Sequence, residues 1–235
     1  MDFKRGKILE LNETAKAVQE VAKVSGKAID AVSKFGEFIS RFISGPIEQG
    51  MGIYVDKLTY YRWEFQQSLI LKSEFFMKEK GIEFPNKAIP LKLAVPLFQG
   101  ASMEENNELQ DLWAKLLVNA TNIESCIDLK RVYIDILERL TPIEAQILFS
   151  IYSLPFEEIQ HKGVLTAELP CNAYPVIESK KAEALEPSDE IKLALASLSS
   201  IGCLSPSKTW GGGEVFALVN PTILGRSFVN ACKLN

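Results

Sequence analysis

Apolar residues recur at alternating steps of three and four between residues 13 and 44. The stripe consists of Val18, Val21, Ala28, Val32, Phe35, Ile39 and Phe42, with Ser25 as its one polar interruption, and charged residues fill the other side. A Ser-Gly-Pro break at 44–46 ends this pattern, and a second one of the same kind runs from Ile47 to Lys80 and Gly81, which are typical of a helix end. Two long helices joined by so short a turn predict an antiparallel helical hairpin.

The next segment predicts a small helical bundle. Residues 89–98 are strongly apolar and predict a short buried helix that is interrupted near Pro96. Ser102 and Glu105 have the spacing of a capping box, which predicts that the following helix starts there. A further helix is expected at 128–140. The apolar face behind the predicted capping box consists of Leu109, Leu112, Trp113, Leu116, Leu117 and Ala120.

The pattern changes after Leu140. Thr141, Pro142 and Glu144 predict the start of a helix that reaches Ser153, and a loop-rich insert follows at 154–187. Another helix is expected from Ser188 to Gly202. Two strand-like runs at 203–208 and 214–219 predict a β-hairpin, and a final helix is expected from Asn220 and Pro221 to Ala231. This order of elements is typical of a winged-helix domain.

These patterns together predict a mainly α protein with two units. The first unit, residues 1–140, is a long N-terminal helical hairpin with a small helical bundle. The second unit, residues 141–235, is a winged-helix-like C-terminal unit with one β-hairpin. A chain of 235 residues, 47% of them hydrophobic, can bury the cores of two small domains.

Charge argues against a nucleic-acid-binding role for the winged-helix-like unit. The whole chain has a net charge of −4, and residues 141–235 carry seven basic and ten acidic side chains. The helix that would read a DNA groove offers Lys192 beside Asp189 and Glu190, whereas groove readers need several cationic or amide side chains. A protein-contact or structural winged helix is therefore favoured, with a nucleic-acid-binding regulator as the alternative.

An acidic run is the first candidate for chemistry. It consists of Glu104, Glu105, Glu108 and Asp111, and its place at a predicted helix N-terminus is explained by the helix dipole. Neither a histidine nor a loop of alternating ligands accompanies it, so we assign no metal site. An unrecognised hydrolase built on these carboxylates remains a third hypothesis. We assign no catalytic residue and no cofactor, and a non-enzymatic role is favoured.

Other reactive residue types have simpler explanations. His161, the single histidine, lies in a polar stretch without a nucleophile motif and is expected at the surface. The glycines at 211–213 lack the Lys-Ser/Thr of a phosphate-binding loop and fit a hairpin turn. The cysteines lack metal-ligand spacing and are expected to be buried or half-buried free thiols in a reducing cytosol. They are Cys126, Cys171, Cys203 and Cys232.

The N-terminal helices offer the best candidates for a contact surface. Residues 1–45 carry eight basic and six acidic groups, a balance too mixed for strong attraction to lipid. Packing in the hairpin or in an oligomeric coiled coil is therefore favoured over peripheral membrane contact. The aromatic residues Tyr54, Tyr61 and Phe65 are interpreted as packing. The interaction candidates are Phe35, Phe38, Phe42, Arg62 and Trp63.

Several of these segments resemble the Abi-alpha (abortive infection) family of bacterial proteins. The likeness covers most of the first 150 residues and includes the segments at 45–47, 61–62, 89–92 and 96–97. Its most specific parts are MEENNELQDLWAKLL at 103–117 and LERLTPIEA at 137–145. The resemblance implies a bacterial cytoplasmic component of phage defence, and it transfers no catalytic residue. The sequence specifies neither the biochemical activity, nor the partner, nor the oligomeric state.

Overall fold

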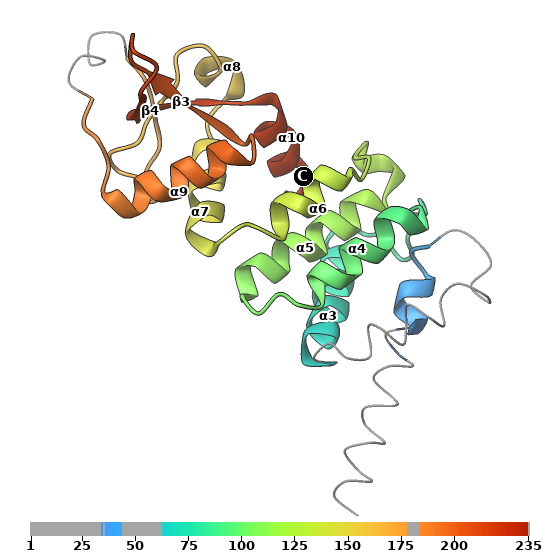
Figure 1. Cartoon of the computed structure of the whole chain (residues 1–235). Helices are drawn as coiled ribbons and strands as arrows, with labels where there is room; N and C mark the ends of the chain where they lie inside the picture. Colours follow the sequence, from blue (N-terminus) through green and yellow to red (C-terminus); the bar gives the residue numbers. More distant parts are fainter. Residues whose placement is uncertain (1–33, 35, 44–62, 178–183, 235) are drawn as a thin grey trace, which may run out of the picture.

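The computed structural model describes residues 34, 36–43, 63–177 and 184–234. Most of the predicted N-terminal hairpin lies outside these residues. Within them the protein is mainly helical with one small antiparallel sheet, so the expected mainly α class is confirmed. Figure 1 shows the helical part at the lower right and the sheet with its helices at the upper left.

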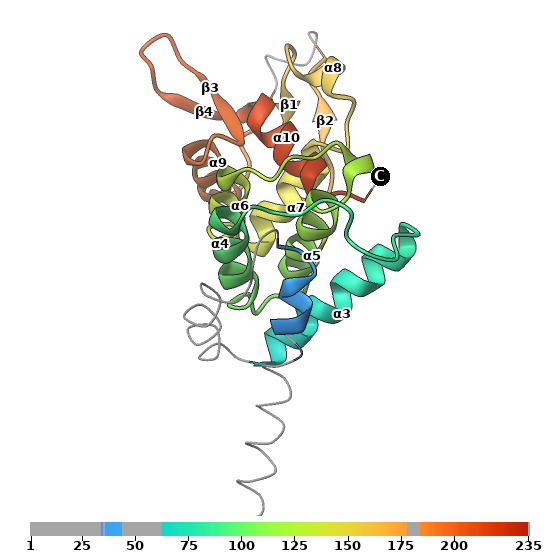
Figure 2. The same cartoon turned by 90° about the vertical axis from the view of Figure 1, so that its right-hand side faces the viewer.

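Helix α5 (Asn107–Ala120) is the centre of the helical part. It contacts α3 (Trp63–Glu79), α4 (Leu91–Ala101) and α6 (Arg131–Leu137), and its last turn leads into the short 3-10 helix η1 (Ile123–Ser125). Figure 2 shows α3 crossing the outside of this group. Most side chains of α5 are buried because neighbouring helices cover α5 from several sides. They include Leu109, Leu112, Trp113, Leu116, Leu117 and Ala120, as the apolar pattern predicts.

Helix α3 ends where the sequence predicts. Gly81 adopts φ +65°, the amide of Gly81 donates to the carbonyl of Lys78, and the amide of Ile82 donates to that of Met77. Glycine tolerates this left-handed conformation, which is common just after a helix C-terminus. The helix-ending role of the Lys-Gly pair is therefore confirmed.

Helix α4 is not interrupted at Pro96, and the predicted break is wrong. The helix runs through Pro96, which is buried together with Leu97 and Phe98. Proline inside a helix costs about 3 kcal/mol or more, so the burial of these apolar side chains offsets the lost backbone hydrogen bond. Gly100 lets α4 approach α5 closely, because an added Cβ would come 2.5 Å from Cη2 of Trp113.

The structure confirms the predicted start of one helix and corrects that of another. Thr141 and Glu144 form the predicted capping box at the start of α7 (Pro142–Ile151). The capping box predicted at Ser102 and Glu105 is wrong. Asn106 caps α5 instead, since its side chain accepts from the amides of the second and third residues of that helix. Both residues could cap a helix, and α4 extends far enough to take Ser102 as its own C-cap.

The C-terminal part combines helices with a four-stranded sheet. The order of the strands is β2–β1–β4–β3, and all neighbours are antiparallel. The predicted hairpin is confirmed as β3 (Leu204–Lys208) and β4 (Glu214–Pro221). The other elements are α8 (Phe156–Ile159), β1 (Val164–Leu165), β2 (Tyr174–Pro175), α9 (Asp189–Ser200) and α10 (Ile223–Ala231).

Two boundaries in this part differ from prediction. The insert expected to be loop-rich supplies α8 and also β1 and β2, which are two-residue strands too short to show an alternating pattern. The final helix begins at Ile223 with Thr222 as its N-cap, because Asn220 and Pro221 still belong to β4. Ser188 caps α9 as predicted, and Gly202 follows its end with φ +77°.

The boundary proposed between residues 140 and 141 falls between α6 and α7. Buried apolar residues on both sides of it belong to one cluster that extends from Phe38 to Cys232. Helix α10 contacts α5, and the Asn119 amide donates to the backbone carbonyls of Ala231 and Lys233 at 2.9 and 2.6 Å. The end of the C-terminal part is thus fastened to the central helix of the first part.

Candidate functional site

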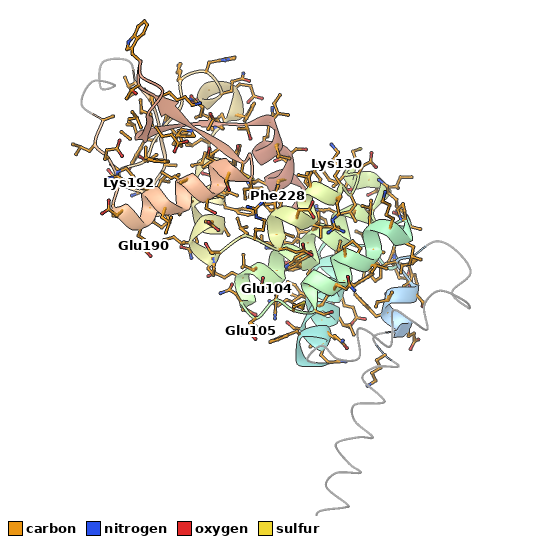
Figure 3. The ribbon with its side chains drawn as sticks, viewed as in Figure 1. Glu104, Glu105, Lys130, Glu190, Lys192 and Phe228 are labelled. Carbon is orange, nitrogen blue, oxygen red and sulfur yellow. The ribbon has the colours of Figure 1, made fainter. Side chains whose placement is uncertain are left out.

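The acidic run before and within α5 is divided among separate structural contacts. Glu104 accepts a hydrogen bond from the amide of Asn106 at 2.8 Å, and Asp111 forms an ion pair with Lys72 of α3. Glu108 in the first helical turn accepts from the Gln146 amide at 3.3 Å. Figure 3 shows Glu104 and Glu105 beside the start of α5. Within the described ranges, no group of three or more His, Cys, Asp or Glu side chains is arranged to hold a metal ion.

His161 is exposed just after α8, where the sequence predicts it. The glycines at 211–213 belong to the turn between β3 and β4. This turn is closed by the amide of Thr209 donating to the carbonyl of Gly213 at 2.8 Å, and by the amide of Gly212 donating to the carbonyl of Thr209 at 2.9 Å. The hairpin-turn interpretation of this glycine run is therefore confirmed.

The predicted interaction residues fall into two groups. Phe38 and Phe42 are 3% and 0% exposed, and both rings lie edge-on to Phe98 with centroids 6.3 and 6.4 Å away. In this arrangement they pack within the core rather than face a partner. Phe35, Arg62 and the side chain of Trp63 lie outside the part that the structure describes.

The C-terminal part instead exposes large apolar side chains that the sequence interpretation missed. Trp210 at the tip of the β3–β4 hairpin is fully exposed, and Leu193 on α9 is 74% exposed. We call residues Thr209–Gly213 the wing tip. A tryptophan followed by three glycines in a predicted hairpin turn is the sequence signal that could have identified it, because such a turn has no core in which to bury the ring.

Acidic groups surround Lys192, the lysine of α9. Lys192 of α9 forms ion pairs with Asp189 at 3.3 Å and Glu186 at 3.9 Å. Glu186 also accepts a hydrogen bond from the amide of Phe216 in β4. Figure 3 shows Glu190 and Lys192 together at the first turns of α9. The one lysine that could reach a phosphate from α9 is therefore already paired with carboxylates.

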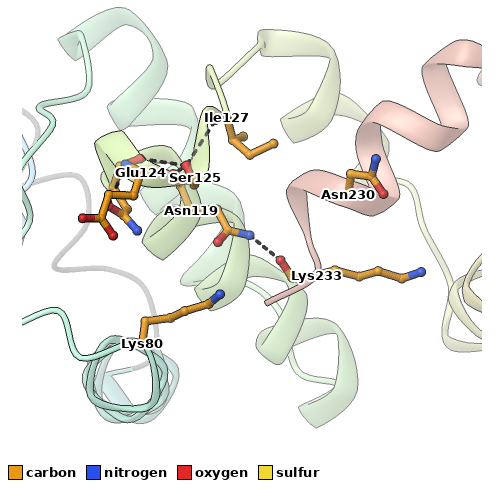
Figure 4. Close-up of a pocket in the computed structure, with 8 residues that line it drawn as sticks. Lys80, Asn119, Glu124, Ser125, Ile127, Asn230 and Lys233 are labelled. Atoms are coloured by element: carbon orange, nitrogen blue, oxygen red, sulfur yellow. Dashed lines mark hydrogen bonds between the residues drawn. The ribbon is translucent and has the colours of Figure 1, made fainter. Parts of the chain in front are cut away.

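A polar hollow lies where α3, the end of α5, η1 and the end of α10 meet. Its volume is about 320 Å³, and Figure 4 shows Lys80, which directly follows α3, reaching into it toward Asn119. The Lys233 side chain extends away from Asn119, and its ammonium donates to the carbonyl of Tyr152 at 3.0 Å. We call this feature the polar hollow. It is lined by Lys80, Asn119, Asn122, Glu124, Ser125, Ile127, Asn230 and Lys233.

The buried ionisable groups lie near the junction of α7, β3 and α10. Burial raises the pKa of the Cys203 thiol to about 12, and burial also raises the pKa of the Cys232 thiol. Both side chains are fully buried, whereas Cys126 and Cys171 are exposed. All four are free thiols, but the expectation that all four are buried or half-buried is wrong for the latter two.

None of the helices within the described ranges combines the length and apolar character needed to cross a membrane. A family model described as Abortive infection alpha matches residues 64–232, which is more than half of the chain. The match reaches much farther toward the C-terminus than the sequence resemblance suggested, and it starts after the segments at 45–47 and 61–62. No curated protein and no solved structure matches the chain.

Proposed function

Because the chain belongs to the Abortive infection alpha family, we propose that it is a bacterial phage-defence protein that acts by contacting another protein rather than by catalysis. The observation that carries this proposal is Trp210, which is fully exposed on a short hydrogen-bonded turn. Tryptophan is rarely left so exposed, and it is enriched among the residues that dominate binding energy at protein interfaces.

We further propose that the C-terminal part is winged-helix-like. The support is topological: α9 leads directly into β3, β3 pairs with β4, and β4 pairs with β1 from earlier in the chain. In this interpretation the β3–β4 hairpin is the wing, and α9 occupies the position of a recognition helix. Fold likeness alone does not assign a ligand, so the side chains on these elements must decide.

Those side chains favour a protein partner over nucleic acid. Glu186, Asp189 and Glu190 lie in or beside α9, and Lys192 is paired with the first two. Carboxylates on a groove-facing helix would repel phosphates, and nucleic-acid binders gain most of their affinity from cationic contacts to phosphate. Exposed Leu193 and Trp210 instead suit apolar contacts with a protein partner, and the carboxylates near α9 suit basic side chains on that partner.

The N-terminal amphipathic stripe provides a second surface in this proposal. Residues 13–44 have the heptad spacing of a helix that packs on another helix. Phe38, Ile39 and Phe42 at its end are buried in the core of the same chain, so we propose self-association for the stripe before them, with peripheral membrane contact as the alternative. This part of the proposal rests on the sequence pattern alone. We also propose a cytoplasmic location, as the family resemblance implies.

Filter binding to duplex DNA across a salt series separates protein contact from nucleic-acid binding. We expect no retention of DNA even at low salt. Retention that falls steeply as salt rises would contradict the proposal, because such a slope reports contacts to phosphate.

Isosteric amide substitutions separate contact from catalysis. The variant carrying Glu104→Gln, Glu105→Gln, Glu108→Gln and Asp111→Asn loses the carboxylates that a hydrolase would need and keeps their shapes. We expect it to protect cells from phage as well as the unchanged protein does. Loss of protection in a variant that still unfolds at an unchanged temperature would support the hydrolase alternative instead.

A further inference from the structure

The polar hollow gathers residues from three distant parts of the sequence. Lys80 follows α3, Asn119 and Asn122 flank the end of α5, and Asn230 lies in the last turn of α10. Such convergence brings the helical part and the C-terminal part to one place. A molecule bound there would contact both parts at once.

Several polar groups in the hollow have no hydrogen-bond partner among the described residues. The ammonium of half-buried Lys80 is one, and the side-chain amide of exposed Asn230 is another. Asn122 is 7% exposed, and its side-chain oxygen accepts from the amide of Glu124 while its amide nitrogen has no acceptor. Asn119 is 5% exposed. Its side-chain amide nitrogen donates to the carbonyls of Ala231 and Lys233, whereas its side-chain oxygen has no donor. These atoms are reached by solvent rather than sealed in the core, so a polar ligand can bind them without breaking an existing hydrogen bond within the protein.

Charge selects the class of ligand. Lys80 and Lys233 contribute two positive charges and Glu124 one negative charge, so the lining carries a net charge of +1. The Lys233 ammonium is held by the Tyr152 carbonyl, which leaves Lys80 as the lining cation whose donors are available. An anionic group near Lys80 would form charge-assisted hydrogen bonds, and the asparagine amides would bind neighbouring donors and acceptors.

We propose that the polar hollow binds a small organic anion, with its phosphate or carboxylate on Lys80 and its polar body on Asn119, Asn122 and Asn230. A volume of about 320 Å³ lies at the small end of the range of roughly 300–1,000 Å³ found for small-molecule sites. The lining is almost entirely polar, and Ile127 is its single apolar member. It therefore suits a hydrophilic metabolite rather than an apolar one. This inference does not depend on the wing tip or on the partner proposed for it.

Calorimetric titration of the full chain tests the proposal with defined probes. The probes are the four ribonucleoside 5′-monophosphates for the phosphate source, L-glutamate for the carboxylate source, and inorganic phosphate as the bare anion. We expect at least one organic probe to bind at up to millimolar concentration and more tightly than inorganic phosphate. Binding by none of the organic probes, or by inorganic phosphate equally well, overturns the proposal.

Matched lysine substitutions locate the bound probe. Lys80→Ala removes the cation of the hollow, whereas Lys92→Ala removes an exposed lysine of α4 that does not line it. Loss of a charge-assisted hydrogen bond should weaken binding by about tenfold or more in the first variant and leave it unchanged in the second. Equal binding by Lys80→Ala and the unchanged protein would place the probe elsewhere and overturn the proposal. Equal unfolding temperatures of both variants without ligand exclude misfolding as the cause.

Discussion

The hydroxyl of Tyr152 donates a hydrogen bond to the backbone carbonyl of Cys203 over 2.7 Å. The same oxygen accepts from the amide of Thr222 at 2.9 Å, so one side chain at the end of α7 joins the start of β3 to the start of α10. The side chain is 8% exposed, and burial raises the pKa of its hydroxyl to about 12. This group therefore fixes how the hairpin that carries the wing tip is attached to the helices.

Tyr152→Phe should destabilise the protein by about 1–3 kcal/mol, because it leaves the carbonyl of Cys203 and the amide of Thr222 without this partner. Urea unfolding followed by circular dichroism measures the change. Tyr174→Phe is the matched control, since its exposed hydroxyl makes one long bond of 3.3 Å to Glu168. The control should stay within about 0.5 kcal/mol of the unchanged protein. Equal effects of the two substitutions would show that the Tyr152 hydrogen bonds contribute little.

Gly225→Ala should strongly destabilise the same junction. An added Cβ would lie 2.2 Å from the carbonyl oxygen of Cys203 and 2.2 Å from the hydroxyl of Tyr152, and the first of these atoms is backbone. Overpacking of this kind costs about 1–3 kcal/mol and sometimes more. Gly36→Ala is the control because an added Cβ there meets nothing within 4 Å in a helical stretch. We expect the control to be neutral or to gain up to about 1 kcal/mol in thermal unfolding, and the opposite order would contradict the packing described.

Stability should fall as the pH rises above about 9. The ordinary pKa of a cysteine thiol is 9.0, and burial raises that of Cys203 to about 12. Between these values the unfolded chain releases the proton while the folded protein keeps it, so the unfolded state binds fewer protons and the free energy of unfolding decreases with pH. One such group contributes at most about 1.4 kcal/mol per pH unit. The same sign holds for Tyr152, whose pKa rises from 10.0 to about 12.

Urea unfolding at pH 8, 9, 10 and 11 measures this dependence. Cys203→Ala should decline less steeply with pH than the unchanged protein, whatever its stability at neutral pH. Cys171→Ala, which removes an exposed thiol, serves as the control and should keep the original slope. Parallel curves for all three proteins would argue against a protonated Cys203 thiol in the folded state.

Local signals in the sequence predict the structure correctly where a single residue determines a helix cap or a turn. Thr141 and Ser188 cap their helices as predicted, and the glycines between the two strand-like runs close the hairpin. The failures arose where tertiary packing chose between local alternatives. Asn106 rather than Ser102 caps α5, and the burial of Pro96 keeps α4 continuous.

The candidate sites were harder to predict than the fold. Phe38 and Phe42 follow an amphipathic stripe that does not reveal what covers it, and the structure places them against Phe98. The polar hollow joins Lys80 to Asn230 across most of the chain, so no local spacing could indicate it. Trp210 was visible as a tryptophan in a glycine-rich turn, but its full exposure depends on how the hairpin projects from the sheet.

The most direct test of contact through the wing tip is the efficiency of phage plating on cells that express Trp210→Ala, compared with cells that express Ile223→Ala. Ile223 is a matched control because it is 81% exposed at the start of α10, beyond the other end of β4. Losing a contact worth about 1.4 kcal/mol or more weakens binding at least tenfold. Cells that express Trp210→Ala should therefore lose protection, although the variant is expressed and unfolds like the unchanged protein. Cells that express Ile223→Ala should keep protection. Full protection by Trp210→Ala would contradict the claim that this protein acts through its wing tip.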